Sequence, residues 1–323
     1  NHPTQSASIS RRRAVEQGVI TDTTSREEAR KARLRKERWT RRWPLLPALL
    51  FTIVITQIPF LMNLWYSLTD WKITPPVPRT FIGLENYATL FTNTFFRSAV
   101  WVTTVMTVGA VALSVLFGLG IALLLDREFF GRGLVRTLLI TPFLIMPVVA
   151  GLIWKTQIFH SLYGVLNWVI TAFGFEPIEF VGRMPTWSII AVLVWQWTPF
   201  MMLITLAGLQ SRPTDILEAA RVDGASSWAL FRHITLPGLR PYLELGALLG
   251  SIYLIQVFDH IDVITGGGPG STNVPYFVYQ RSIGGGWDFG QAAAYSTVVV
   301  VASIVLATFG LRLLGGLLPK EEI

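Results

Sequence analysis

The chain contains no cysteine, few histidines and few charged residues. Of its 323 residues, 4 are His and only 15% are Asp, Glu, Lys or Arg, against about a quarter in an average soluble domain. Without cysteine, the sequence excludes disulfides, thiolate catalysis and thiolate metal sites. The histidines are too scattered for a zinc motif: His2, His160, His233 and His260. We therefore expect this chain to bind no metal and no cofactor.

Apolar sequence is abundant instead. Hydrophobic residues make up 51% of the chain, and the mean hydropathy is +0.48. They gather in runs long enough, at about 1.5 Å of rise per residue, to cross a hydrocarbon core about 30 Å thick. The sequence predicts an all-α, polytopic transmembrane bundle of about six spans. The predicted spans are residues 45–68, 99–125, 134–155, 187–209, 242–264 and 292–317.

The net charge of +7 lies in the first residues of the chain. Residues 1–43 hold 12 Lys and Arg against 5 Asp and Glu, so the rest of the chain is neutral. A basic tail can bind nucleic acid, but this one runs directly into the first span, where cations are retained on the cytoplasmic side and attracted to anionic lipid. We expect a cytoplasmic tail at 1–43, a membrane domain at 44–323, and no nucleic-acid partner.

The positions of Lys and Arg also predict the orientation of the spans. With the N-terminus inside, 21 of the 27 Lys and Arg lie in or beside the inside segments, and 5 lie in the outside loops. Positively charged loops stay in the cytoplasm. Both termini are therefore expected on the cytoplasmic side of a multi-pass protein.

Four prolines fall inside predicted spans: Pro59, Pro142, Pro147 and Pro199. Membrane helices tolerate proline where neighbouring groups satisfy the freed carbonyls. Two interpretations remain open. The prolines produce ordinary kinks, which the sequence favours, or they mark discontinuous helices.

Residues 210–241, between the fourth and fifth spans, predict two short helices. Pro213 and the two residues after it start the first helix, and Asp223-Gly224 ends it with a turn. Ser226 and Ser227 can cap a second helix, which Pro237 is expected to stop. Both helices carry apolar residues, and apolar residues exposed on such a hairpin need a partner protein.

The spacing within this loop resembles a known signature. Glu218-Ala219-Ala220 is followed after three residues by Gly224 and after nine more by Ile234-Thr235-Leu236-Pro237. This is similar to the EAA motif of ABC importer permeases. The resemblance implies that loop 210–241 docks on a separate ATPase. The implied docking residues are Glu218, Ala219, Ala220, Arg221, Asp223 and Gly224. The alternative is an amphipathic hairpin lying on the membrane surface.

Two further segments narrow the resemblance. Residues 81–87 (FIGLENY) and 265–269 (TGGGP), with the tyrosines and Phe-Gly pair that follow, resemble outside loops of carbohydrate permeases of the maltose and glycerol-phosphate type. The family implies a second permease as heterodimer partner, two ATPase subunits that bind ATP and Mg, and an extracytoplasmic substrate-binding protein. The loop GGGPGSTN lacks the Gly-Lys-Ser/Thr ending of a P-loop, so ATP hydrolysis is expected on another chain.

The fifth predicted span carries unusually polar residues for a membrane helix. Tyr253, Gln256, Asp259 and His260 share one helical face, and polar groups at membrane depth usually face a cavity or a partner. Together they offer hydrogen bonds and an aromatic surface to a sugar. The alternative, that Asp259, His260 and Asp262 are simply hydrated at the outer interface, weighs equally. Trp195 and Trp197 in the fourth span are a second candidate lining.

These features predict a non-catalytic permease subunit in a bacterial plasma membrane. It would form half of the translocation pathway of an ATP-driven, binding-protein-dependent importer of a sugar or polyol. The main alternative is a solitary secondary transporter of a small polar solute, although such proteins normally show inverted repeats, and none is visible here. A membrane-embedded enzyme would have only Asp259-His260-Asp262 as titratable cluster.

Overall fold

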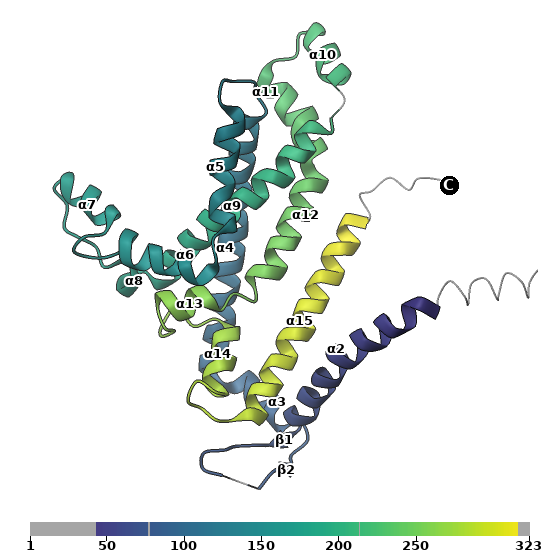
Figure 1. The fold of residues 1–323 in the computed structure, drawn as a ribbon, viewed down its shortest axis with the longest axis vertical. Coiled ribbons are helices and arrows are strands. Elements are labelled where there is room, and N and C mark those ends of the chain that lie inside the picture. The colour runs from purple at the N-terminus through teal and green to yellow at the C-terminus, as the bar shows by residue number, and fades with distance from the viewer. Residues whose placement is uncertain (1–42, 77, 213, 316–323) are drawn as a thin grey trace, which may run out of the picture. The chain divides into compact units, whose positions relative to one another are not determined.

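The computed structural model describes residues 43–76, 78–212 and 214–315, most of which are helical (Figure 1). The elements in chain order are η1 (Trp43–Leu45), α2 (Leu46–Ser67), β1 (Thr69–Asp70), β2 (Thr80–Phe81), α3 (Glu85–Thr92), α4 (Thr94–Leu125), α5 (Arg132–Leu144), α6 (Pro147–Ile153), η2 (Trp154–Ile158), α7 (Val165–Ala172), α8 (Phe180–Arg183), α9 (Pro185–Gln210), α10 (Thr214–Val222), α11 (Ser227–Leu230), η3 (Phe231–Thr235), α12 (Leu236–Leu254), α13 (Asp259–Ile264), α14 (Val274–Arg281) and α15 (Phe289–Gly315).

The chain divides into two units, Asn1–Met62 and Asn63–Ile323. In the first unit the described residues begin at Trp43 and form η1 and most of α2. Their large apolar side chains are exposed, with Leu50 at 64% and Phe51 at 67%, as expected of a helix whose solvent is lipid. The prediction of a basic tail falls mainly on residues 1–42, which lie outside the described ranges.

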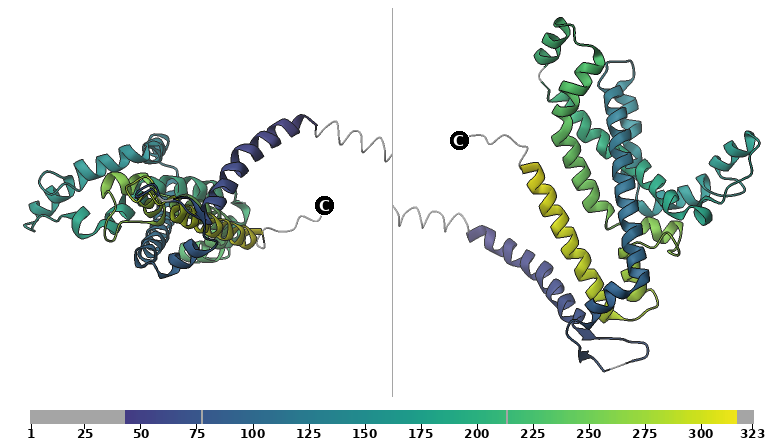
Figure 2. Two further views of the ribbon diagram at one scale, coloured as in Figure 1. Left: turned by 90° about the horizontal axis from the view of Figure 1, so that it is seen from below. Right: turned by 180° about the vertical axis from the view of Figure 1, so that it is seen from behind.

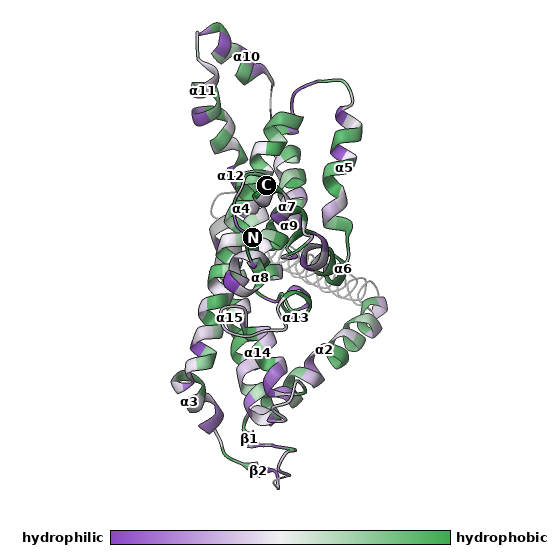
Figure 3. Cartoon of the chain, turned by 90° about the vertical axis from the view of Figure 1, so that its left-hand side faces the viewer, coloured by the Kyte–Doolittle hydropathy of each residue, from purple (hydrophilic) through white to green (hydrophobic). Residues whose placement is uncertain are grey.

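Four described helices are long and apolar enough to cross a membrane: Trp43–Ser67, Thr94–Leu125, Pro185–Gln210 and Phe289–Thr308. A bent pair, Arg132–Leu144 and Pro147–Ile158, raises this number to five if the pair is one span. Green, hydrophobic segments are frequent along the central helices in Figure 3, around the labels α4 and α9. The predicted all-α membrane fold is confirmed, whereas the count of six spans is not.

The predicted third span is not a continuous helix. The chain bends by 100° between α5 and α6. Ile145 and Met146 have extended backbones, with ψ of 134° at both. At Met146 the cause is the ring of Pro147, which disfavours a helical conformation in the residue before it. Pro147 itself occupies the first turn of α6, where a missing N–H leaves no hydrogen bond unmade. Of the two interpretations of the prolines, discontinuity holds here, while Pro59 and Pro199 lie inside intact helices.

Two other predictions about the fifth span were wrong. Pro237 does not stop the second hairpin helix: helical backbone runs without a break from α11 through η3 into α12. The π-helical turn of η3 directly precedes α12, and Pro237 lies in the first turn of α12, a position where proline is tolerated. The helix ends earlier than predicted at the other end: α12 stops at Leu254, and α13 follows as a separate helix.

The core of the second unit lies where α4, α9 and α12 pack together. Helices α9 and α12 run alongside α4 in Figure 1, and the view from behind in Figure 2 shows the same arrangement. Ala110, Ile189 and Leu193 are fully buried between them. At Gly118 the approach is so close that a Cβ atom would lie 2.6 Å from Cβ of Met201. Backbone therefore meets backbone along this helix pair.

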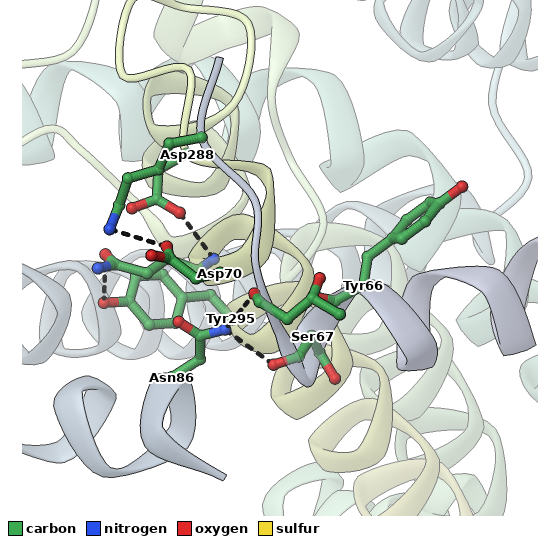
Figure 4. A network of polar contacts seen from close by, with 9 residues as sticks. Tyr66, Ser67, Asp70, Asn86, Asp288 and Tyr295 are labelled. Carbon is green, nitrogen blue, oxygen red and sulfur yellow. Dashed lines mark hydrogen bonds and ion pairs between the residues drawn. The ribbon is translucent and has the colours of Figure 1, made fainter. Parts of the chain in front are cut away.

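A polar network joins the two short strands to the start of α15 (Figure 4). β1 and β2 are antiparallel, the backbones of Lys72 and Asp288 form an isolated antiparallel β-bridge, and the Lys72 ammonium pairs with the Asp70 carboxylate at 2.9 Å. Asn86 donates hydrogen bonds to the carbonyls of Ser67 (2.9 Å) and Thr69 (3.0 Å). The Asp288 carboxylate caps α15 by accepting the N–H of Gln291 at 3.0 Å, and burial raises the pKa of Asp288. These contacts fix the connection that leads into α15.

Candidate functional site

The predicted hairpin has helices on both sides of Gly224 (Figure 1). The Gly224 N–H donates to the Arg221 carbonyl at 3.1 Å, and the Ala225 N–H donates to the Ala220 carbonyl at 3.0 Å. This pair of bonds is the Schellman motif that ends helices, and it requires a left-handed residue. Gly224 has φ of +85°, a conformation that costs glycine little. Ser226 then caps α11 by accepting the Ala229 N–H at 3.3 Å.

The residues assigned to docking by the sequence lie on an open surface. Ala220 is half-buried, and the others are exposed: Glu218, Ala219, Arg221, Asp223 and Gly224. Large apolar side chains are exposed beside them, with Ile216 at 54%, Val222 at 87% and Trp228 at 66%. Neither α10 nor α11 is long enough to cross a membrane. The hairpin thus presents charged, small and apolar groups together, as protein-binding surfaces do.

A cavity of about 520 Å³ lies where α9 faces the two broken spans. Its walls come from the α5–α6 break, from α9, and from the segment linking α12 to α13. The lining residues are Phe143, Ile145, Pro147, Gln196, Trp197, Phe200, Tyr253, Gln256, Val257, Phe258, Asp259 and His260. The volume is within the range of about 300–1,000 Å³ found for small-molecule sites.

One wall of this cavity is a cluster of aromatic rings. The ring centre of Trp197 lies 5.5 Å from those of both Tyr253 and Phe200, and Phe143 is 5.4 Å from Phe200. Tyr253 remains 63% exposed. Rings held by one another in this way keep faces available to an apolar ligand surface at little cost in side-chain entropy.

The polar groups of the cavity fall into two kinds. Gln256 and Asp259 are exposed and can meet a ligand. His260 and Gln196 are only 3% and 4% exposed, and His260 Nε2 lies 2.7 Å from Gln196 Oε1. Gln196 in turn donates to the carbonyl of Ile145 at 2.7 Å, which satisfies an orphan carbonyl at the end of α5. Because the Gln196 oxygen must then accept, His260 carries its proton on Nε2.

The structure therefore brings together five of the six residues predicted to contact substrate. They do not form one helical stripe, since the chain leaves the helix between Leu254 and α13. Trp195 is the exception. It packs against Trp154 at 5.7 Å and lines a separate apolar pocket between α4, α5 and α9. The alternative, in which Asp259, His260 and Asp262 are simply hydrated, is wrong for His260, which is buried. Asp262 is exposed and accepts a hydrogen bond from the Tyr276 hydroxyl at 3.3 Å, and its hydration stays a prediction.

Sequence reasoning missed the contribution of the third span to the cavity. Phe143, Ile145 and Pro147 line it because the break exposes them to α9. Pro142 and Pro147 were the only signals in the sequence for that break. Phe258 was missed as well, since it lies in the non-helical link before α13. Among the described residues, no group of three His, Asp or Glu side chains is placed to hold a metal ion.

Comparison with known proteins gives a consistent result. The model of the family described as "binding-protein-dependent transport system inner membrane component" matches residues 114–320. The probable ABC transporter permease protein y4oQ of Sinorhizobium fredii is 38% identical over 268 residues, which is 82% of this chain and 86% of that protein. The trehalose/maltose transport system permease protein MalF of Thermococcus litoralis is 34% identical over 267 residues, 81% of this chain and 90% of that protein.

A third relative extends the match to almost the whole chain. The trehalose transport system permease protein SugA of Mycobacterium tuberculosis is 31% identical over 310 residues, 96% of this chain and 98% of that protein. Among solved structures, a bacterial ABC transporter involved in the import of the acidic polysaccharide alginate has a chain with a TM-score of 0.73 at 21% identity, covering 86% of this chain and 97% of that one. This last likeness supports the fold alone.

The fold and these matches define a multi-pass inner-membrane transport permease, a class of transport component rather than of catalyst. The chain belongs to the family of binding-protein-dependent transport system inner membrane components, the permease subunits of ABC importers. The resemblance to carbohydrate permeases inferred from its loop motifs is thereby confirmed.

Proposed function

We propose that the chain is one of two permease subunits of an ATP-driven importer of a neutral sugar or polyol. A binding protein outside the membrane delivers the solute, and two ATPase subunits on the cytoplasmic side bind ATP and Mg. The chain itself binds no cofactor and breaks no bond. Both of its termini lie in the cytoplasm, on the same side as the hairpin.

The hairpin surface is the observation that carries this proposal. Its exposed side chains gather around a turn whose shape is set by Gly224, and apolar groups such as Val222 and Trp228 gain by burial in a partner. The spacing of the EAA motif assigns that partner as the ATPase. The two hydrogen bonds of the Schellman motif join α10 and the turn into one compact element. Once docked, this element follows the movement of the ATPase as a unit.

The cavity supports a carbohydrate as the solute. Hydroxyl groups require hydrogen-bonding partners, which Gln256 and Asp259 provide, and the C–H faces of a sugar ring match the faces of Trp197 and Tyr253. Asp259 is the single charged residue among those that line the cavity in the described structure. A carboxylate without a cation beside it repels acidic solutes, so the cavity suits an uncharged sugar.

The test is purification followed by reconstitution. The tagged chain is isolated from its native membrane in mild detergent, the proteins that accompany it are identified, and the complex is placed in proteoliposomes with the binding protein. We expect a P-loop ATPase and a second permease to accompany it. Uptake of a radiolabelled panel of trehalose, maltose and glycerol should then depend on ATP inside and on binding protein outside.

The outcomes separate the alternatives. Recovery of the chain alone, in detergent that preserves a known ABC importer prepared in parallel, with ATP-independent uptake, indicates a solitary transporter and refutes the proposal. Selective uptake of sugar acids over neutral sugars leaves the importer assignment intact. It refutes the claim that the Asp259 carboxylate excludes acidic solutes.

A further inference from the structure

The end of the second unit that carries the hairpin contains a half-buried cation with three partners. Arg212 lies two residues after the end of α9, and its side chain is only 15% exposed. Its Nη2 lies 3.1 Å from the carboxylate of Asp126, its Nη1 donates to Thr235 Oγ1 at 2.7 Å, and its Nε donates to the Leu209 carbonyl at 3.0 Å. We call these four residues the Arg212 clamp.

Each partner in the clamp belongs to a different element. Asp126 is the residue at the end of α4, Leu209 lies in the last turn of α9, and Thr235 ends η3, immediately before α12. A guanidinium group is planar and presents its donors in a fixed fork, so all three directions are set at once. The positions of three helix ends are therefore fixed relative to one another by one side chain.

The surroundings of the clamp leave these helix ends little freedom. Ser211 and Tyr242 bring their hydroxyl oxygens within 2.8 Å, which ties α9 to α12 a second time. A Cβ atom at Gly208 would lie 2.7 Å from the ring of Tyr242. Beneath them α4, α9 and α12 share a buried apolar cluster that consists of Ala122, Leu125, Met202, Leu206, Leu209 and Leu239.

The clamp also joins the two ends of the hairpin. Arg212 precedes α10 and Thr235 follows α11, so the bond between them closes the loop that the hairpin forms. A force on the hairpin thus acts on α4, α9 and α12 together and cannot be absorbed by bending of one connection. Helix α9 then leads from Leu209 to Phe200 in the cavity wall, nine residues or about 13.5 Å away.

We propose that Arg212 is a positioning residue that makes the hairpin and the adjoining ends of α4, α9 and α12 move as one body, so that displacement of the hairpin reaches the cavity. The inference rests on the proposed function, in which an ATPase displaces the hairpin. Without the clamp, the hairpin still docks and ATP is still hydrolysed, but the motion is lost in the connections.

The first experiment measures solute moved per ATP hydrolysed by the complete transporter in proteoliposomes. Arg212→Lys keeps the charge but cannot reach three acceptors, and Asp126→Asn removes the ion pair while preserving shape. Each variant is expected to lower the solute-to-ATP ratio at least fivefold, with ATP hydrolysis within twofold of wild type. Arg240→Gln is the matched control, since it breaks an exposed ion pair with Glu244 on α12 (2.6 Å) and should change nothing.

The second experiment measures whether the parts move together. The chain has no cysteine, so spin labels can be attached at Ser227→Cys on α11, outside the residues assigned to docking, and at Leu124→Cys on α4; both positions are exposed. With an intact clamp the distance between the labels should be the same with and without a non-hydrolysable ATP analogue. In the Arg212→Lys background the distance should change with nucleotide.

Three results are decisive against these ideas. If the wild-type complex moves no solute on ATP, the proposed function fails and the clamp with it. If wild type couples and both variants keep its solute-to-ATP ratio, the clamp alone is refuted. If the distance between the two spin labels already changes with nucleotide in the wild-type clamp, the single moving body is refuted. If Arg212→Lys does not assemble into the complex, the solute-to-ATP ratio of Asp126→Asn decides between these outcomes.

Discussion

The close contact between α4 and α9 makes a sharp prediction at Gly118. A Cβ atom there would lie 2.6 Å from Met201 Cβ, 2.8 Å from Met202 N and 2.9 Å from Met201 C. Carbon atoms in contact prefer about 3.5–4.0 Å, so the helices must separate in Gly118→Ala. Because two of these atoms are backbone, no rotamer change relieves the clash. Overpacking of this kind costs about 1–3 kcal/mol.

The matched control is Gly120→Ala on the same helix. A Cβ at Gly120 meets nothing within 4 Å, and alanine is better than glycine in a helix by about 0.8–1 kcal/mol. Both variants gain this propensity, so the difference between them isolates the clash at about 1–3 kcal/mol. We expect Gly120→Ala to raise the thermal unfolding midpoint of the detergent-solubilised protein and Gly118→Ala to lower it. Equal midpoints for the two variants would refute backbone contact between α4 and α9.

Three further predictions concern the hairpin, the cavity and the network at α15. Gly224→Leu adds about 1–2 kcal/mol of backbone strain and a bulky group to the docking surface, so uptake should be lost while ATP hydrolysis and membrane insertion persist. The control is Gly174→Leu, because Gly174 also has a positive φ (+83°) and open space around it. Trp197→Ala should lower the maximal uptake rate about tenfold, measured with saturating binding protein, because one aromatic contact contributes roughly 1.4 kcal/mol; an unchanged rate excludes the ring from the solute path. Burial raises the pKa of Asp288 above 3.8, so its ionised form opposes folding, and wild type should gain stability relative to Asp288→Asn as the pH falls from 7 towards 4. Parallel unfolding midpoints of the two proteins across that range would contradict the shift.

The parts of the structure that the sequence predicted best are those with local causes. The turn at Gly224 and the cap at Ser226 depend on residues within one helical turn, and both occur where the spacing placed them. The long apolar helices depend only on composition. The cavity residues from Tyr253 to His260 were found because polar groups in an apolar segment are costly unless they face something useful.

What the sequence could not predict depends on distant partners. Pro147 breaks its span although Pro199 does not break α9, and the carbonyl of Ile145 at that break is satisfied by Gln196 from another helix. Trp195 and Trp197 are two residues apart, and only their neighbours decide which of them faces the cavity. Nothing in the sequence distinguishes Arg212 from other loop cations, because its ion pair with Asp126 joins residues far apart in the chain.

The contact at Gly118 also limits how the molecule can change shape. If α4 slid along α9, the side chains next to Gly118 would clash with the backbone of α9, so the two helices cannot slide past each other. α9 nevertheless forms one wall of the cavity. A change in the width of the cavity therefore requires α4 and α9 to move together relative to the opposite walls. Those walls are the α5–α6 break and the link between α12 and α13, where the backbone is not held by a continuous helix. The α4–α9 pair moves as one rigid piece, and the two interrupted spans are the places where the backbone can bend.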